Sequence, residues 1–279
     1  VAHKPLIEAD GRDNLRGKRE LMILATWGPK ALSQAIADAR AALIADDVQP
    51  VERLVVCDLL GWGLQDKANR PESCKKMLEH PFFTMRSRRK SVVLDSAAED
   101  AAGAEETKGQ SAVEMKVTED QVLSLEAGCK LATKLHIAAE LGGPLSLFET
   151  SNTTADELTS KRHYLQRTPL HLAVEGAHHA VVEAIFRAAK AHDVRSSDLE
   201  QKDLLGDAPI HSLLKAIEAA AKSDAGPAGL DAFIVTLKTL GAEADVNVVD
   251  GNGNTAFAIG EMSASPDVRN LVKEFKMRN

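Results

Sequence analysis

Residues 167–186 read RTPLHLAVEGAHHAVVEAIF, a pattern of two short helices joined by a turn. Thr168 and Pro169 suit a helix start, because the threonine side chain accepts from free amides of the first turn and the φ of proline is already helical. Gly176 is expected to end the first helix in a left-handed conformation. A second apolar stripe follows at 181–186. Such a unit cannot bury its apolar face alone, so the pattern predicts stacked copies.

Three further segments of the same kind occur in the C-terminal half. They begin at Thr133, 35 positions earlier, at Ala208, 40 positions later, and at Thr255, 47 positions beyond that. We therefore predict an all-α fold, an α-solenoid of about four irregular repeats. The spacings exceed the usual period of about 33 residues for such repeats, which implies insertions such as 150–161 and 221–230.

These segments resemble ankyrin repeats, whose pattern is a turn, a T-P-L-H-x-A helix, a glycine and a second helix that ends near G-A-D-V-N. The resemblance covers about residues 122–279. Lys134 stands where the family has proline, and Ala208 lacks the capping threonine. The positions that carry the resemblance are Thr133, His136, Thr168, Pro169, Leu170, His171, Gly176, Pro209, His211, Asp245, Asn247, Gly253 and Thr255.

The ankyrin resemblance implies a protein partner, bound through the turn tips and the concave face, and no chemical reaction. It also implies that His136, His171 and His211 each make a structural hydrogen bond to a neighbouring repeat. A metal site is the poorer interpretation, because these histidines fall on separate repeats without acidic or cysteine companions. We interpret the pair His178–His179 as a solvated turn.

A second resemblance lies earlier, where residues 57–83 read CDLLGWGLQDKANRPESCKKMLEHPFF. This run resembles the last part of the large lobe of a eukaryotic protein kinase, which carries R-P and H-P-F-F anchors at matching separation. Lys67 stands where the family has proline. The alternative is that the two X-Pro pairs bracket a short helix in an unrelated helical domain. The matching positions include Asp66, Arg70, Pro71, His80, Pro81 and Phe83.

The parts of a kinase that perform catalysis are not in this sequence. The Gly-rich loop, V-A-I-K, H-R-D and D-F-G segments that hold ATP, magnesium and the catalytic base are missing. We therefore expect no catalytic residue, cofactor or metal ligand in this chain, and ATP and magnesium only in a complete parent kinase. Because the chain begins at Val1, we expect it to be part of a longer product.

Composition divides the chain into three parts. Residues 96–109 hold almost no large apolar side chain and cannot bury enough surface to offset the entropy cost of ordering. We predict a helical subdomain at 1–86, a flexible linker at 87–121 and the repeat domain at 122–279. Helices are expected at 19–46, with a break at Gly28–Pro29, and at 51–65 and 73–79. We expect the first domain to be the less stable one.

Charge and hydrophobicity exclude several classes of function. The net charge of −7 over 279 residues argues against nucleic-acid binding and fits a protein that meets other proteins. No apolar run is long enough to span a bilayer, so we expect no membrane contact. The three cysteines contain no C-x-x-C and favour reduced thiols in the cytoplasm or nucleus.

Two functional hypotheses follow from these observations. In the first, the chain is a non-catalytic part of a protein kinase whose repeats bind a protein. In the second, it is an ankyrin-repeat scaffold or adaptor with an unrelated N-terminal helical domain and no kinase activity.

Overall fold

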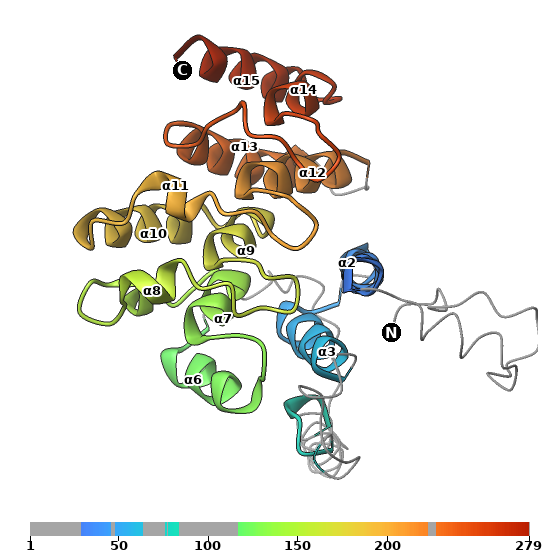
Figure 1. The fold of residues 1–279 in the computed structure, drawn as a ribbon, viewed down its shortest axis with the longest axis vertical. Coiled ribbons are helices and arrows are strands. Elements are labelled where there is room, and N and C mark those ends of the chain that lie inside the picture. The colour runs from blue at the N-terminus through green and yellow to red at the C-terminus, as the bar shows by residue number, and fades with distance from the viewer. Residues whose placement is uncertain are drawn as a thin grey trace, which may run out of the picture.

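The computed structural model describes residues 29–45, 48–63, 76, 78–83, 117–222 and 227–278 (Figure 1). Within these ranges the regular elements are helices, and a single isolated bridge joins Val249 and Thr255. The all-α class predicted from the sequence is confirmed for this part of the chain. Among the described residues, no helix is both long enough and apolar enough to cross a membrane.

Residues 117–278 form a column of stacked helices in two rows (Figure 1). The first row consists of α7 (Lys134–Leu141), α9 (Pro169–Glu175), α12 (Pro209–Lys222) and α14 (Ala256–Glu261). The second row consists of η1 (Leu145–Phe148), α8 (Ala155–Leu158), α10 (His179–Ala191), α11 (Ser196–Leu199), α13 (Pro227–Gly241) and α15 (Pro266–Arg278). Along the first row each helix packs on the next, and along the second row α10 packs on η1, α8 and α13, and α13 packs on α15.

Threonine caps begin three of the four first-row helices. The Thr255 hydroxyl accepts from the amide of Ala258 at 3.1 Å. At Thr133 and Thr168 the third helical residue is a histidine that completes a capping box, and Pro169 occupies the first turn of α9. A threonine cap therefore marks the start of α7, α9 and α14, and a proline at the first position marks the start of α9 and α12.

Gly176 ends α9 in a different way from the sequence expectation. Its φ is −82°, and the left-handed residue is Ala177, with φ 56°. A Cβ at position 176 would lie 2.4 Å from the His178 imidazole. Glycine is therefore needed here for space. At the end of α7, Gly142 does adopt the left-handed conformation, with φ 79°.

Both expected insertions contain helical residues. Segment 150–161 contains the short helix α8, and a capping box between Thr154 and Glu157 starts it. In the second, residues 221–222 end α12 and residues 227–230 begin α13. Helix α12 has 14 residues where α9 has 7.

The column also begins earlier than expected. Helix α6 (Glu119–Gly128) packs on α7, and Thr118 and Gln121 form its capping box. Residues 118–121, predicted as the end of the linker, are therefore the cap and first turn of a helix. The rest of that linker lies outside the described residues.

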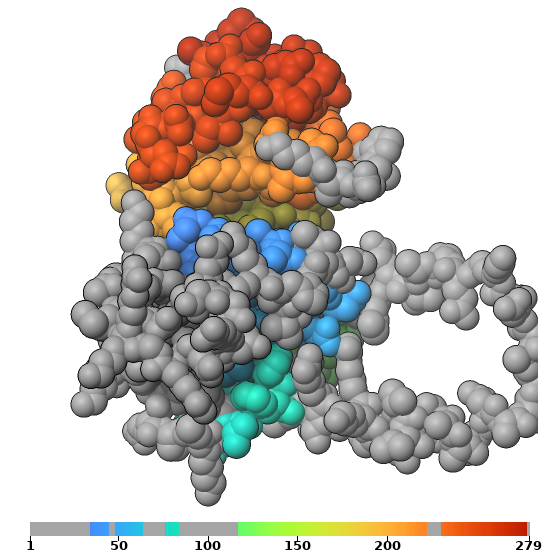
Figure 2. Space-filling model, turned by 90° about the vertical axis from the view of Figure 1, so that its right-hand side faces the viewer, coloured from blue at the N-terminus to red at the C-terminus, as the bar shows by residue number. Residues whose placement is uncertain are grey.

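Two N-terminal helices lie beside the first row of the column (Figure 1). They are α2 (Pro29–Ala45) and α3 (Pro50–Gly63), which pack on each other, and α3 also packs on α7. Leu54 and Val55 of α3 belong to the hydrophobic core that runs through the column. Figure 2 shows this side, with α2 and α3 over its lower part and the last helix pairs above them.

Candidate functional site

A row of buried histidines connects successive helix pairs. The Nε2 atom of His136 donates to the carbonyl of Arg167 at 2.9 Å, and that of His171 donates to the carbonyl of Asp207 at 3.0 Å. The Nε2 atom of His211 donates to the carbonyl of Val248 at 3.0 Å. The hydrogen bonds that the sequence predicted between neighbouring units are therefore present.

The second ring nitrogen fixes the protonation state of these histidines. Each Nδ1 accepts the backbone N–H at its own helix start, at 3.4 Å from Thr133, 3.2 Å from Thr168 and 3.1 Å from Ala208. A ring that accepts at Nδ1 and donates at Nε2 is neutral. Burial lowers the pKa of His136 to about 4 and that of His171 to about 4. Burial also lowers the pKa of His211.

Three similar turns lead into α9, α12 and α14. Asp203 Oδ1 accepts from the amides of Leu205 and Asp207, and Asp250 Oδ1 accepts from those of Asn252 and Asn254. The same position of each turn is left-handed, at Gln166 (φ 52°), Gly206 (φ 87°) and Gly253 (φ 86°). The turns also pack closely, since a Cβ on Gly251 would lie 2.0 Å from the carbonyl oxygen of Leu205.

The other motif residues hold these units together. Leu170 is buried in the core of the column, and Pro209 begins α12. The Asp245 carboxylate accepts from the amide of Asn247 at 2.8 Å, and the Asp245 amide donates to Glu200 at 2.7 Å. These contacts hold the backbone between α13 and the turn that precedes α14.

His178 is not the solvated turn that the sequence suggested. Its Nε2 atom lies 3.3 Å from the carbonyl oxygen of Glu140 in the preceding helix pair. The ring fits against Gly142 and Gly176, because the left-handed Ala177 turns it back toward the column. Burial lowers the pKa of this imidazole. His179 is exposed.

A buried network of charges joins the N-terminal helices to the first row. Arg40 Nη2 lies 2.6 Å from Glu140 Oε2 and 2.8 Å from Glu175 Oε2. Arg53 Nη2 lies 3.2 Å from Glu140 Oε1. On the other side, Arg167 Nη1 lies 2.8 Å from Glu175 Oε2. The network thus spans α2, α3, α7 and α9, and no local sequence signal predicted it.

The opposite charges in this network shift the pKa values of Arg40 and Glu175. Burial alone would lower the pKa of Arg40, but the carboxylates of Glu140 and Glu175 outweigh that effect and raise it. Burial would raise the pKa of Glu175, but Arg167 and Arg40 lower it to about 2. Arg40 and Glu175 are therefore both charged near neutral pH.

Glu140 and Glu175 occupy equivalent places in their helix pairs. Each lies seven positions after its capping threonine, and the same offset from Ala208 and Thr255 leads to Lys215 and Met262. We call these four residues the variable row. Lys215 pairs with Asp207 at 2.6 Å and lies 3.6 Å from Asp250. Met262 is 75% exposed. The first two side chains of the row are therefore acidic and covered, the third is basic, and the fourth is apolar and exposed.

A small cavity lies beside the open end of the variable row. Its volume is about 190 Å³. It lies between α12 and the end of α14 and is lined by Leu214, Glu218, Ile259, Met262 and Ser263.

The described residues of the kinase-like run attach to the first end of the column. His80 Nε2 lies 2.9 Å from Asp58 Oδ2, and its ring stacks on Trp62. The Asp58 carboxylate also accepts the amides of Lys130 and Leu131, each at 2.9 Å. Pro81 packs against Gly128, and Phe83 lies edge-on to Phe82. Asp66, Arg70 and Pro71 lie outside the described residues.

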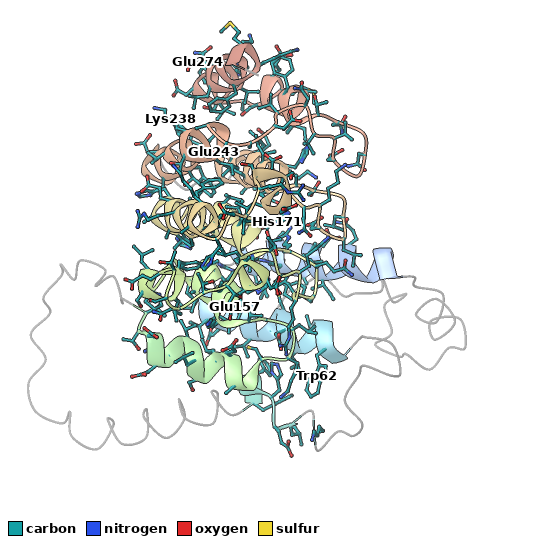
Figure 3. The ribbon with its side chains drawn as sticks, turned by 60° about the vertical axis from the view of Figure 1, so that its left-hand side comes forward. Trp62, Glu157, His171, Lys238, Glu243 and Glu274 are labelled. Atoms are coloured by element: carbon teal, nitrogen blue, oxygen red, sulfur yellow. The ribbon has the colours of Figure 1, made fainter. Side chains whose placement is uncertain are left out.

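Figure 3 separates structural from surface positions. His171 lies inside the column, whereas Glu157, Lys238, Glu243 and Glu274 project from its outer surface.

Within the part of the chain that the structure describes, no group of three or more His, Cys, Asp or Glu residues could hold a metal ion. Comparisons with protein-family models, curated proteins and solved structures found no match to this chain.

Proposed function

We propose that this chain is a protein-binding module built from ankyrin-type repeats. The observation that carries the proposal is the row of three buried histidines, each bonded to a carbonyl one unit further along. The histidine three positions after each helix start accepts from the first backbone amide and also joins its helix to the next unit. Repetition of one local device at successive units is the behaviour expected of a repeat array.

The variable row supports binding as the activity. Histidine occurs at the same structural position in three of the four units. The variable row instead carries Glu140, Glu175, Lys215 and Met262 on one side of the column. Such a surface can recognise a partner through side-chain identity without any change to the fold.

We propose that the parent protein is a Ser/Thr-type protein kinase, with residues 57–83 as the end of its large lobe. The matched spacing of R-P and H-P-F-F supports this origin, as does the buried contact of His80 with Asp58. The alternative, a scaffold with an unrelated N-terminal helical domain, is favoured by the core that α3 shares with the column. Kinase motifs encoded upstream of Val1 would establish the first proposal, and an unrelated upstream domain would refute it.

The binding function can be tested with two exposed methionines. Met262 lies at the open end of the variable row and is 75% exposed, whereas Met277 lies on α15 and is 81% exposed. A photo-crosslinking amino acid is introduced at position 262 in one variant of the full chain and at position 277 in another. Both variants are expressed in the organism that the protein comes from, and the second serves as the matched control. We expect a discrete protein adduct from position 262 and none from position 277.

Two outcomes of the crosslinking experiment would contradict this expectation. Equal adducts at both positions would indicate contact without a defined surface. If no adduct formed at position 262 while circular dichroism showed the variant to be folded, binding at this surface would be refuted.

A further inference from the structure

Helix α2 shows what kind of segment binds at Glu140 and Glu175, the acidic half of the variable row. In α2 the buried side chains are Ile36, Arg40 and Leu43, which lie on one face of the helix. The guanidinium at the centre of this face contacts Glu140 and Glu175, which belong to neighbouring helix pairs. One arginine therefore connects two units of the column.

The two N-terminal helices are attached in different ways. Leu54 and Val55 of α3 are members of the column's hydrophobic core. Ile36 and Leu43 of α2 are buried but are not members of that core. Helix α3 therefore packs into the core of the column, whereas α2 packs on α3 and places Arg40 against Glu140 and Glu175.

The position of α2 along the column follows from charge. The variable row is acidic only at its first two places, and Lys215 occupies the third. An arginine placed one unit further along would lie between Glu175 and Lys215, so it would meet one carboxylate and one like charge instead of two carboxylates. The acidic pair thus selects both the chemistry and the register of the helix that covers it.

The contact also leaves the arginine incompletely satisfied. Arg40 Nη1 is buried and makes no hydrogen bond. A buried ion pair adds little net stability, because the desolvation of both charges offsets their attraction. Release of α2 would leave neither carboxylate without a cation, because Arg53 also pairs with Glu140 and Arg167 also pairs with Glu175. The contact of Arg40 is therefore one that another arginine can replace.

We propose that Glu140 and Glu175 form a docking site for an amphipathic helix that carries an arginine, a site that α2 fills within the chain and that a partner's helix takes by displacing α2. This inference rests on the protein-binding function proposed above and adds to it a second contact region and the chemistry of the partner. The displaced state keeps α3 in the core and exposes the acidic pair.

A synthetic peptide of residues 29–45 is the direct probe. Wild-type chain is expected to bind it weakly, because the tethered α2 competes at an effective concentration of about millimolar order. The full chain with Arg40→Ala should bind the peptide at least about tenfold more tightly. A peptide with Arg40→Glu should not bind either chain. Adding Glu175→Gln to the Arg40→Ala chain should weaken binding of the original peptide.

Hydrogen exchange gives a second measurement that needs no variant. With excess peptide, wild-type chain should lose protection in α2 and keep it in α3 and α9. The proposal is overturned if the Arg40→Ala chain, or the wild type by exchange, shows no binding or no release of α2. Binding that ignores the arginine of the peptide also overturns it. Neither result affects the adduct at Met262, so the two proposals fail separately.

Discussion

Histidine chemistry decides how the units of this column are joined. In His171 one nitrogen accepts from the amide of Thr168 and the other donates to the carbonyl of Asp207. A proton added at Nδ1 would face the N–H of Thr168, and the Thr168 hydroxyl, 2.8 Å from Nδ1, would have to turn from donor to acceptor. The same residue thus starts one helix and attaches the next, provided that it stays neutral.

This arrangement predicts acid sensitivity. Burial lowers the pKa of His136 and of His171 from 6.5 to about 4. In the unfolded chain these groups take up protons near pH 6.5, so their stabilising effect is complete above that pH. It declines as the pH falls toward 4, by about 1.4 kcal/mol per pH unit for each histidine. Urea unfolding at a series of pH values measures this slope.

A variant isolates one histidine in this measurement. His171→Asn retains hydrogen-bonding groups but does not titrate, so the pH slope should shrink by about the share of one histidine. An unchanged slope would show that acid sensitivity arises elsewhere.

At the residue scale, the sequence was informative where one short segment contains both partners. The cap at Thr168 was predicted from the sequence, and His171, three positions further on, completes its capping box. The role of His178 was not readable, because its acceptor is the carbonyl of Glu140, 38 positions away. Only the folded column brings these two groups together.

At the scale of elements, Asp58 is the joint between α3 and the column. Its carboxylate accepts from His80 and from the amides of Lys130 and Leu131. These amides lie just after α6, so the joint connects α3, the H-P-F-F segment and the first end of the stack. A single acidic side chain thus fixes three elements.

Asp58→Ala should loosen this joint. Two backbone donors and His80 would lose their acceptor, and each unsatisfied buried group costs about 1–3 kcal/mol. We expect a loss of roughly 2–4 kcal/mol in the free energy of unfolding. Amide exchange at Lys130 and Leu131 should accelerate.

The control for this substitution is Asp38→Ala on the exposed side of α2, where the carboxylate only accepts from Gln34. Such an i,i+4 contact contributes about 0.5 kcal/mol or less. Equal effects of the two substitutions would contradict the role assigned to Asp58.

Element boundaries followed local signals more closely than element lengths did. The N-cap at Thr118 placed a helix inside the predicted linker because Gln121 completes its box. The extra residues near 221 continue α12, a result that the repeat spacing alone did not distinguish from a loop. Length depends on what the added turns can pack against.

For the whole molecule, one continuous core governs stability. It includes residues from α3 and from every helix pair of the column, as far as the structure describes them. Neighbouring units therefore share their apolar surface, and damage to one exposes the next.

Leu170→Asp tests this cooperativity. Leu170 is 1% exposed within α9, and an unpaired carboxylate at a buried site costs several kcal/mol. Because domains have about 5–15 kcal/mol of stability, we expect a large drop in helicity and melting temperature.

Leu145→Asp provides the matched control, since Leu145 is 46% exposed. It should leave the melting temperature nearly unchanged. If the Leu170 variant kept the wild-type melting temperature, the units would not share a core.

By itself, the sequence determined the helical class and the start of each first-row helix. These features depend on residues three or four positions apart, whose contacts exist within a single turn of helix. Their repetition along the chain also indicated a stack. The protein-binding function and the kinase origin remain proposals built on these patterns.

The tertiary structure alone decided where the N-terminal helices lie and what the variable row contacts. Arg40 and Glu140 are 100 positions apart, yet their side chains form a buried ion pair. Glu175 and Lys215 are both charged residues in the sequence, and nothing local marks one as covered by α2 and the other as paired with Asp207. Charge pairs of this kind depend on position in space, which the sequence pattern of a repeat does not encode.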